Sequence, residues 1–425
     1  MAGDPFDTAT LRRRVLDAWA ASPERFREDA NAEEDLALGG YRDRLIVELA
    51  QNAADAATRA GTPGTLRLRL ADGVLSAANT GAPLDVAGVK ALSSLRASAK
   101  RDDSTVGRFG VGFAAVLAVT DEPEIRSKAG GVRFSAAETR KEVAGLPSLA
   151  GELARRGGAV PVLRLPRPLH GRPPAGFTTE VRLPLRDSAV EIVRTALESL
   201  DASLLLALPN LSTVDVNGRM ITRSGDEPQV VISDNHQVTR WRVVRAEGEV
   251  PPELLAGRPT EERERSGWTV LWAVPETGLV GRQVVYAPTP SDEPLSLPAR
   301  LVASFPLGPD RRHVAPGPLT DWLIQRCADT YLELIQALGS GPEVLDLVPA
   351  PGIVAGELDA ALCAAVLNRM RAADWLPGGI VPSAARVLGL GLEAAVPLLR
   401  DVIPNLLPAE WSGRRAQRPL QALGV

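Results

Sequence analysis

Apolar residues recur along the chain with two spacings, one typical of helices and one typical of strands. Between residues 41 and 61 they recur every three or four positions and predict a helix with one apolar face: Leu45, Ile46, Leu49, Ala53 and Ala56. Gly61 then supplies a stop signal. Residues 66–70 alternate as a strand, residues 73–78 follow as its hairpin partner, and residues 177–185 form another strand. The first part of the chain therefore mixes helix and strand.

The later part of the chain repeats this mixture before it becomes helical. Residues 188–208 have the apolar spacing of a helix, and Asn217-Gly218 is a hairpin turn signal. Short apolar strands are predicted in three places: residues 268–275, 282–288 and 299–307. After about residue 319 the pattern is helical again, and prolines interrupt it towards the end of the chain.

Together these patterns predict an α+β chain in four segments. They are an N-terminal arm at residues 1–40, a first domain at residues 41–187, an α/β region at residues 188–340 and a helical C-terminal segment at residues 341–425. A stretch rich in proline, glycine and arginine, residues 164–176, predicts a surface loop. The length of 425 residues is enough for two or three domains.

Composition narrows the classes of function. The 48 basic and 52 acidic residues give a net charge of −4, which argues against a protein that coats nucleic acid. The two cysteines lack the spacing of a zinc cluster or a disulfide framework, and three histidines argue against a histidine-based metal site. No apolar run reaches the ~18 residues of a membrane span, and the start has no secretory pattern, so we expect a cytoplasmic protein that does not enter membranes.

The predicted helix of residues 41–61 carries three polar side chains on one face. Glu48, Asn52 and Asp55 follow one another at spacings of four and three, so they project from one face of the helix. The alternative to a functional set is an ordinary solvated polar face.

Two glycine-containing turns follow. Asn79-Thr80-Gly81 ends a predicted strand, where glycine allows a sharp turn and a close approach to a planar ligand. Gly107, Gly110 and Gly112 precede an apolar helix, which would expose backbone N–H groups to a phosphate chain. No strong parallel-strand pattern precedes these glycines and no Gly-Lys-Ser/Thr follows them, which argues against a dinucleotide-binding fold and a P-loop.

The ordered set ELAQNAADA, NTG, GRFGVGF and FTTEV resembles a known ATP-binding fold. This is the Bergerat fold of the GHKL superfamily, shared by gyrase, the ninety-kilodalton heat-shock chaperones, histidine kinases and mismatch-repair ATPases. The likeness is particularly to the sacsin-type branch of heat-shock-chaperone-like proteins. It covers residues 41–186 well and residues 187–340 more loosely. It implies a helix-over-sheet ATP-binding domain followed by an α/β middle domain.

The resemblance implies a role for each polar residue. Glu48 matches the carboxylate that activates the attacking water, and Asn52 matches the asparagine that holds Mg²⁺. Asp55 matches a pocket acid near the base and ribose. Asn79 stands where most of the superfamily has an aspartate that binds the adenine amino group, a departure that the sacsin-type branch shares. Thr179 matches the threonine that completes the adenine hydrogen-bond network.

The resemblance also implies that the glycine-containing segments bind the phosphates and that the chain between them covers the nucleotide. Residues 82–106 would form a lid over the nucleotide, with Lys100 near a phosphate or simply solvated. The implied nucleotide-binding residues of these segments are Gly81, Lys100, Gly107, Arg108, Phe109, Gly110, Val111, Gly112 and Phe113. In the middle region, the loop at residues 304–314 would offer Arg311 or Arg312 to the γ-phosphate, unless these arginines are there by chance.

The expected function is Mg-dependent ATP binding with slow hydrolysis, which drives lid closure and domain rearrangement in a chaperone-like protein. ATP, ADP and Mg²⁺ are the expected ligands, and a protein client is the expected partner. Related proteins dimerise, so a homodimer is a candidate assembly, although the tail shows no sustained heptad.

The alternative function is a module that senses nucleotide without turnover, and the presence of Glu48 argues against it. A histidine kinase fits less well, because residues 1–47 contain no histidine. A topoisomerase also fits less well, because no basic stripe is present.

Overall fold

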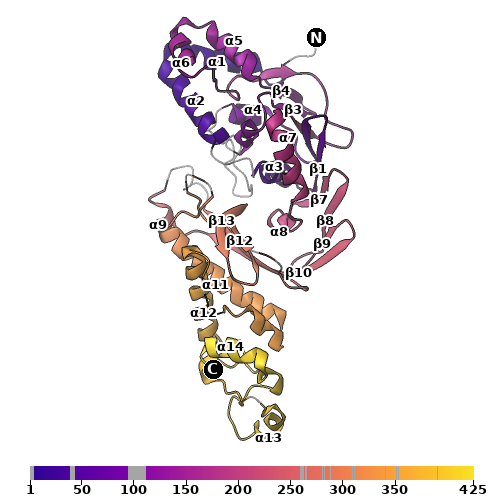
Figure 1. Cartoon of the computed structure of the whole chain (residues 1–425), viewed down its shortest axis with the longest axis vertical. Coiled ribbons are helices and arrows are strands. Elements are labelled where there is room, and N and C mark those ends of the chain that lie inside the picture. Colours follow the sequence, from indigo (N-terminus) through magenta and orange to yellow (C-terminus); the bar gives the residue numbers. More distant parts are fainter. Residues whose placement is uncertain are drawn as a thin grey trace. The chain divides into compact units, whose positions relative to one another are not determined.

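The computed structural model describes the chain with several gaps. The described residues are 4–38, 44–93, 112–258, 263, 266–279, 281, 283–287, 289–308, 310, 312–339, 341–350, 352, 354–389 and 391–425. Helices and extensive β-sheet occur together, as the predicted α+β class requires (Figure 1). Two compact units are present, Met1–Arg223 with Ile232–Gln237 and Ser224–Val231 with Val238–Val425. The chain passes between them at residues 223–238, whereas the sequence pattern placed boundaries near residues 187 and 340.

The first unit is built around a mostly antiparallel sheet with the strand order β8-β7-β1-β2-β6-β3-β4-β5. Only the β1–β7 pair of this unit is parallel among the pairings described. The strands are β1 (Gly64–Ala71), β2 (Val74–Asn79), β3 (Glu124–Ser127), β4 (Gly130–Arg133), β5 (Arg167–Leu169), β6 (Thr179–Pro184), β7 (Leu211–Val216) and β8 (Arg219–Ser224). Strand β9 (Gln229–Asp234) supplies residues to both units.

Two tight turns set the register of this sheet. Asp72 and Gly73 join β1 to β2 with positive φ angles of 49° and 71°. Asn217 and Gly218 join β7 to β8 with φ angles of 51° and 97°, which confirms the predicted hairpin. Positive φ at both central residues is what a two-residue turn between twisted antiparallel strands requires.

The helices of the first unit include the helix predicted at residues 41–61. It is α3 (Leu45–Ala60), and it ends at Gly61 with a φ angle of 64°, as the stop signal predicted. The others are α1 (Thr8–Ala21), α2 (Pro23–Leu38), α4 (Val86–Leu92), α5 (Ala136–Ala144), α6 (Ala150–Arg155), α7 (Asp187–Glu198) and α8 (Leu204–Ala207), with 3-10 helices η2 (Phe113–Ala118) and η3 (Pro147–Leu149). Helix α3 contacts β1, β2, β7 and η2.

The N-terminal helices are part of the first unit, whereas the sequence analysis treated residues 1–40 as an arm. Trp19 of α1 and Phe26 of α2 are fully buried, with their ring centroids 5.2 Å apart. They form a small core with distant residues: Val143, Leu149 and Leu165. The expected surface loop at residues 164–176 is confirmed in part, because residues 170–176 are half-buried or exposed outside helices and strands, whereas Arg164 and Leu165 are buried. Large apolar side chains from segments far apart in sequence hold this region together.

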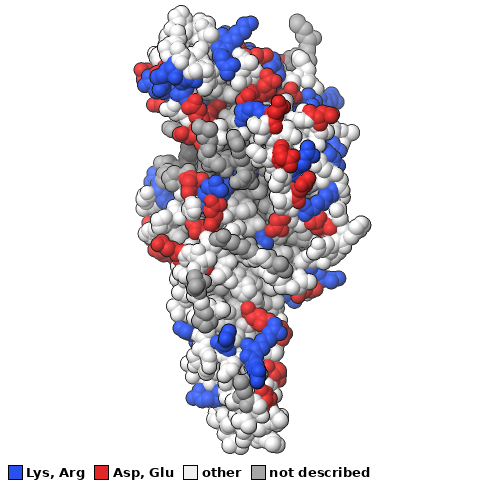
Figure 2. Space-filling view, viewed as in Figure 1, with Lys and Arg blue, Asp and Glu red and all other residues white. Residues whose placement is uncertain are grey.

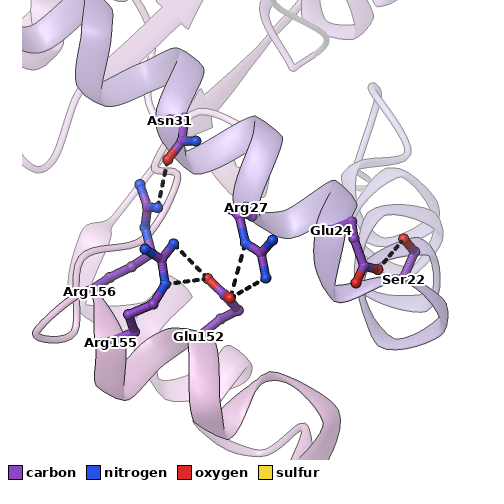
Figure 3. A network of polar contacts seen from close by, with 7 residues as sticks. All are labelled: Ser22, Glu24, Arg27, Asn31, Glu152, Arg155 and Arg156. Atoms are coloured by element: carbon purple, nitrogen blue, oxygen red, sulfur yellow. Dashed lines mark hydrogen bonds and ion pairs between the residues drawn. The ribbon is translucent and has the colours of Figure 1, made fainter.

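Polar contacts add to this packing between α2 and α6 (Figure 3). Glu152 accepts hydrogen bonds from Arg27 and Arg155, and these bonds lower the pKa of Glu152 to about 2. Arg156 donates to Asn31 at 2.7 Å. Figure 2 shows basic side chains gathered where α2 and α6 lie in Figure 1.

A second polar cluster joins α2 to residues 162–164 and is largely buried. Glu33 accepts hydrogen bonds from the backbone N–H groups of Val162 and Leu163, at 2.5 and 3.1 Å. Arg164 lies beside Asp29 and Glu33 and donates to the carbonyl of Ser93, at the end of α4. Burial raises the pKa of Glu33 to about 7, although Arg164 and the two N–H groups act in the opposite direction.

The raised pKa of Glu33 predicts a pH dependence of stability. A carboxyl whose pKa is higher in the folded than in the unfolded chain destabilises the fold when it ionises. The free energy of unfolding should therefore decrease as the pH rises from 4.5 to about 7, by an amount on the order of 3 kcal/mol. Glu33→Gln should remove this decrease, as measured by urea unfolding at pH 5 to 8.

Glu152→Gln is the matched control, because the pKa of Glu152 lies near 2 and the group stays ionised throughout this range. The slope of stability against pH should be the same in this control as in the parent. An equal slope in Glu33→Gln and the parent would show that Glu33 does not titrate near neutral pH.

The second unit contains the strands β13-β12-β14-β11-β10, which are neighbours in that order in the sheet. These strands are β10 (Gln237–Glu249), β11 (Gly267–Pro275), β12 (Gln283–Tyr286), β13 (Pro290–Leu295) and β14 (Arg300–Ala303). The helices are α9 (Pro252–Leu255), α11 (Pro318–Leu338), α12 (Glu357–Ala372), α13 (Val396–Leu399) and α14 (Arg414–Leu423), with 3-10 helices η4 (Pro342–Leu347), η5 (Pro382–Ala384), η6 (Glu393–Ala395) and η7 (Ala409–Trp411).

Helix α11 covers the sheet of the second unit with an aromatic contact. Trp272 of β11 is buried against Tyr331, with ring centroids 4.8 Å apart, and its indole N–H donates to the carbonyl of Cys327. Within the described ranges, no helix has the length and apolar character needed to cross a membrane.

Candidate functional site

Three polar side chains lie side by side on the inner face of the first unit's sheet. Asn79 of β2 is paired with Thr179 of β6, and Thr179 is paired with Ser127 of β3. Directly paired residues of antiparallel strands share one face, so these three form a continuous set, here called the polar row. The next row on the same face is apolar and consists of Ala77, Val181 and Ile125.

The polar row faces α3. Gly64 lies on the same face of β1 as Leu66, and Leu66 is paired with Asn79. A Cβ atom on Gly64 would lie 2.7 Å from the Cβ of Ala57 on α3, which places this face of the sheet against the helix. Helix α3, which carries Glu48, Asn52 and Asp55, thus packs on the sheet face that carries Asn79 and Thr179.

Asn79 has a defined amide orientation. Its Nδ2 group donates to the carbonyl of Thr80 at 2.7 Å, and the opposite orientation would place two oxygens in contact. Its backbone carbonyl accepts from both the N–H and the hydroxyl of Thr178, at 2.9 and 3.0 Å. The amide oxygen Oδ1 of Asn79 is therefore held as an acceptor on the inner face.

Thr179 carries an unpaired buried hydroxyl. Its Oγ1 atom is shielded from solvent and has no hydrogen-bond partner within the described part of the chain. A buried hydroxyl without a partner costs free energy, about 1 to 3 kcal/mol in proteins. A ligand in contact with the polar row would supply the missing partner.

The turn after Asn79 is fixed against α3. Thr80 accepts a hydrogen bond from the N–H of Thr65 through its hydroxyl, and Ala82 donates to the carbonyl of Ala56 at 2.8 Å. Gly81 has a φ angle of 105°, and a Cβ atom there would lie 2.5 Å from the Ala56 backbone. The close approach that the sequence assigned to a ligand is therefore, in the structure, an approach to the helix.

The polar face of α3 is not an ordinary solvated surface. Asp55 is completely buried, and Glu48 and Asn52 are half-buried. Charged groups are rarely buried in this way without a structural or functional partner. This observation argues against the solvated-face alternative at Asp55.

The helix expected after the glycine-rich motif is a 3-10 helix, η2. Gly112 precedes it, and every residue from Phe113 to Ala118 is buried. Helices α2 and α3 both contact η2. The other predicted residues of this motif lie outside the described ranges: Gly107, Arg108, Phe109, Gly110 and Val111. Lys100 of the expected lid also lies outside them.

The predicted phosphate-binding arginine belongs to the second unit. Arg311 lies outside the described residues, whereas Arg312 is described and its Nε donates to Asp292 at 2.6 Å. Asp310 accepts hydrogen bonds from the backbone N–H of Arg312 and from His313. The His313 contact lowers the pKa of Asp310 to about 2 and raises that of His313. The loop around Arg312 is therefore held by carboxylates.

Comparison of the sequence with models of known protein families and with curated proteins gave no match. In the described ranges, no group of three or more histidine, cysteine, aspartate or glutamate side chains is placed to hold a metal ion. Ser127 is the member of the polar row that the sequence pattern missed. Its pairing with Thr179 joins strands about fifty residues apart in sequence, so no local signal marks it.

The unpaired hydroxyl of Thr179 predicts an unusual stability effect. Thr179→Val removes a buried hydroxyl that has no protein partner, so the ligand-free protein should be as stable as the parent or more stable by up to about 1 kcal/mol. Denaturant unfolding measures the difference.

Thr178→Val is the matched control, because the Thr178 hydroxyl donates to Asn79 and its loss should cost about 1 kcal/mol. If Thr179→Val lost as much stability as this control, the Thr179 hydroxyl would have a partner in the free protein.

Proposed function

We propose that the first unit is an ATP-binding domain of the Bergerat type and that the protein hydrolyses ATP slowly in a chaperone-like cycle. One observation carries the proposal: the buried, unpaired hydroxyl of Thr179 lies beside the fixed acceptor of Asn79, on the sheet face that packs against α3. The ordered sequence motifs support the same assignment, because α3 carries Glu48, Asn52 and Asp55.

The polar row favours adenine over guanine. Adenine presents an amino group next to a ring nitrogen acceptor, and the amide oxygen of Asn79 matches the amino group. Guanine would place a carbonyl oxygen against that acceptor. Asn79 suits this structure better than the usual aspartate of the superfamily, because a carboxylate oxygen would face the carbonyl of Thr80.

Residues of α3 are assigned the chemistry at the phosphates. Glu48 takes a proton from the attacking water, a role suited to a half-buried carboxylate. Asn52 would hold Mg²⁺ through its amide oxygen, and the ion when bound would offset the charge of the phosphates. Asp55, buried beside them, contributes to binding of the base and ribose.

The later steps of the proposed cycle are taken from the resemblance. A lid at residues 82–106 would cover the nucleotide, and Arg312 would stabilise charge on the γ-phosphate. Most of residues 82–106 lie outside the described residues. The protein client and the homodimer are likewise proposed from the resemblance.

A module that binds ATP without turnover is the second candidate. The pairing of Arg312 with Asp292 favours it, because the guanidinium would have to leave this carboxylate or share it with a phosphate. Release of ADP from ATP by the purified protein distinguishes the two functions.

Glu48 and Asn52 lie one helical turn apart and have different proposed tasks. Glu48→Ala should abolish hydrolysis and leave ATP binding within about twofold, because the base acts on water and not on the nucleotide. Asn52→Ala should weaken Mg-ATP binding itself, with turnover reduced as a consequence. Calorimetry and phosphate release measure the two effects.

Glu198→Ala, on the exposed end of α7, is the control and should change neither quantity. Continued turnover by Glu48→Ala, or normal Mg-ATP affinity in Asn52→Ala, would show that the corresponding assignment is wrong.

Arg312 is expected to act in turnover and not in binding. A guanidinium that contacts the γ-phosphate only after rearrangement strengthens its contact in the transition state. Arg312→Ala should therefore slow hydrolysis by about tenfold or more and leave ADP affinity nearly unchanged. Single-turnover phosphate release is the measurement.

The control is Arg415→Ala, which removes another exposed arginine of the second unit from its pairing with a carboxylate, Asp346. Equal rates for the Arg312 variant, the control and the parent would assign the Arg312 loop a purely structural role.

A further inference from the structure

Large apolar side chains are exposed around α13, at the end of the second unit that lies away from its strands (Figure 1). Leu398 is 80% exposed, Val402 is 72% exposed and Leu392, just before η6, is 54% exposed. These three residues are here called the apolar tip. Figure 2 shows mainly uncharged surface at this place. Single exposed apolar residues are common, whereas a group of them indicates a surface that binds a partner.

The segment that carries the apolar tip is folded onto the second unit. Val396 of α13 is buried. The backbone N–H of Arg386 donates to the carbonyl of Asn405 at 3.0 Å, and the carbonyl of Arg386 accepts the N–H of Leu407 at 2.9 Å. Leu407 is fully buried. The segment therefore has a packed side and an exposed side, and the apolar tip lies on the exposed side.

Two residues of the apolar tip adjoin each other. The N–H of Ile403 donates to the carbonyl of Leu399 at 2.8 Å, so helical hydrogen bonding continues beyond the last residue of α13. Residues four positions apart lie on the same side of a helical turn. Leu398 and Val402 therefore form one continuous apolar surface.

The charged residues next to this surface indicate the kind of partner. Arg400 and Asp401 lie between Leu398 and Val402 in sequence, and both are exposed. Consecutive residues of a helical turn project in different directions, so these two charges do not face each other. A surface with one charge of each sign is complementary to itself, because a two-fold rotation can place Arg400 of one copy opposite Asp401 of the other. A surface of a single sign would instead fit an oppositely charged partner.

We propose that the apolar tip is a contact between two copies of this chain, with Leu398 and Val402 packed across a two-fold axis and Arg400 paired with Asp401 on either side. A typical stable interface buries about 800 Å² on each partner, more than three side chains provide, so the association should be weak and reversible. The resemblance implies a homodimer without assigning a surface to it. This inference assigns one, and it does not require that the protein binds ATP.

Sedimentation velocity of the full chain tests this contact. The average mass should rise with protein concentration between about 1 and 100 μM, the range expected of a small interface. Val402→Asp places a charge in the centre of the contact and should weaken self-association by about tenfold or more. Leu398→Asp should have the same effect. Both side chains are exposed in a single copy, so both variants should fold, and thermal unfolding checks that they do.

Val238→Asp is the matched control. Val238 of β10 is also an exposed valine of the second unit, but it lies outside the apolar tip. The same substitution at this position should leave the self-association constant equal to that of the parent.

Exchange of the two charges identifies the partner as a second copy. Arg400→Asp leaves two acidic residues beside the apolar tip, and Asp401→Arg leaves two basic residues. Each variant alone should associate more weakly than the parent, because like charges would meet. An equimolar mixture of the two variants should recover association, because acidic surfaces then meet basic ones. A partner of another kind would not produce this recovery.

Each outcome decides the inference. Weaker association in the Val402 and Leu398 variants, with parental association in Val238→Asp and recovery in the mixture, supports it. A parent that stays monomeric up to about 100 μM, or that associates equally well after Val402→Asp, overturns it and leaves the proposed ATP binding standing. A mixture that associates no better than its components overturns the pairing of two copies. Absence of ATP binding would overturn the proposed function alone.

Discussion

The close contact between α3 and the sheet of the first unit is the constraint on which the site depends. Gly64 and Gly81 approach α3 at Ala57 and Ala56, where a side chain on either glycine would collide with the helix. Small residues on both sides let the helix lie directly on β1 and on the turn after β2. Because of this contact, α3 packs directly on the sheet face that carries the polar row. A bulkier residue at either glycine would separate them.

That contact also explains why polar groups are buried at this place. Asp55 is completely buried and the Thr179 hydroxyl has no partner in the described part of the chain. The unpaired hydroxyl reduces the stability of the free protein, since an apolar side chain in its place would avoid this cost. Functional sites often keep such a group. The remainder of the first unit offsets this cost through apolar packing, including the Trp19 and Phe26 core.

Local sequence signals predicted the parts of the fold that depend on local chemistry. Helix α3, its end at Gly61 and the turn at Asn217-Gly218 all follow from residues within a few positions. The same holds for Asn79 and Thr179, which lie in recognisable motifs. Contacts between distant segments were not predictable. The burial of Trp19 against residues more than a hundred positions away is one example, and the pairing of Ser127 with Thr179 is another. Register between distant strands is a tertiary property that periodicity does not encode.

In the proposed nucleotide site, the unpaired hydroxyl would have a further consequence for discrimination between ligands. A ligand that satisfies Thr179 recovers the cost already present in the free protein, whereas a ligand that cannot pair with it leaves that cost in place. Sites built from buried polar groups therefore reject a mismatched ligand more strongly than apolar pockets do. Asn79 adds to this effect because the carbonyl of Thr80 fixes its amide. A rotated amide could adapt to guanine, but the rotation would bring two oxygens into contact. In the proposed function, base selection would thus come from groups whose orientation is set before any ligand binds.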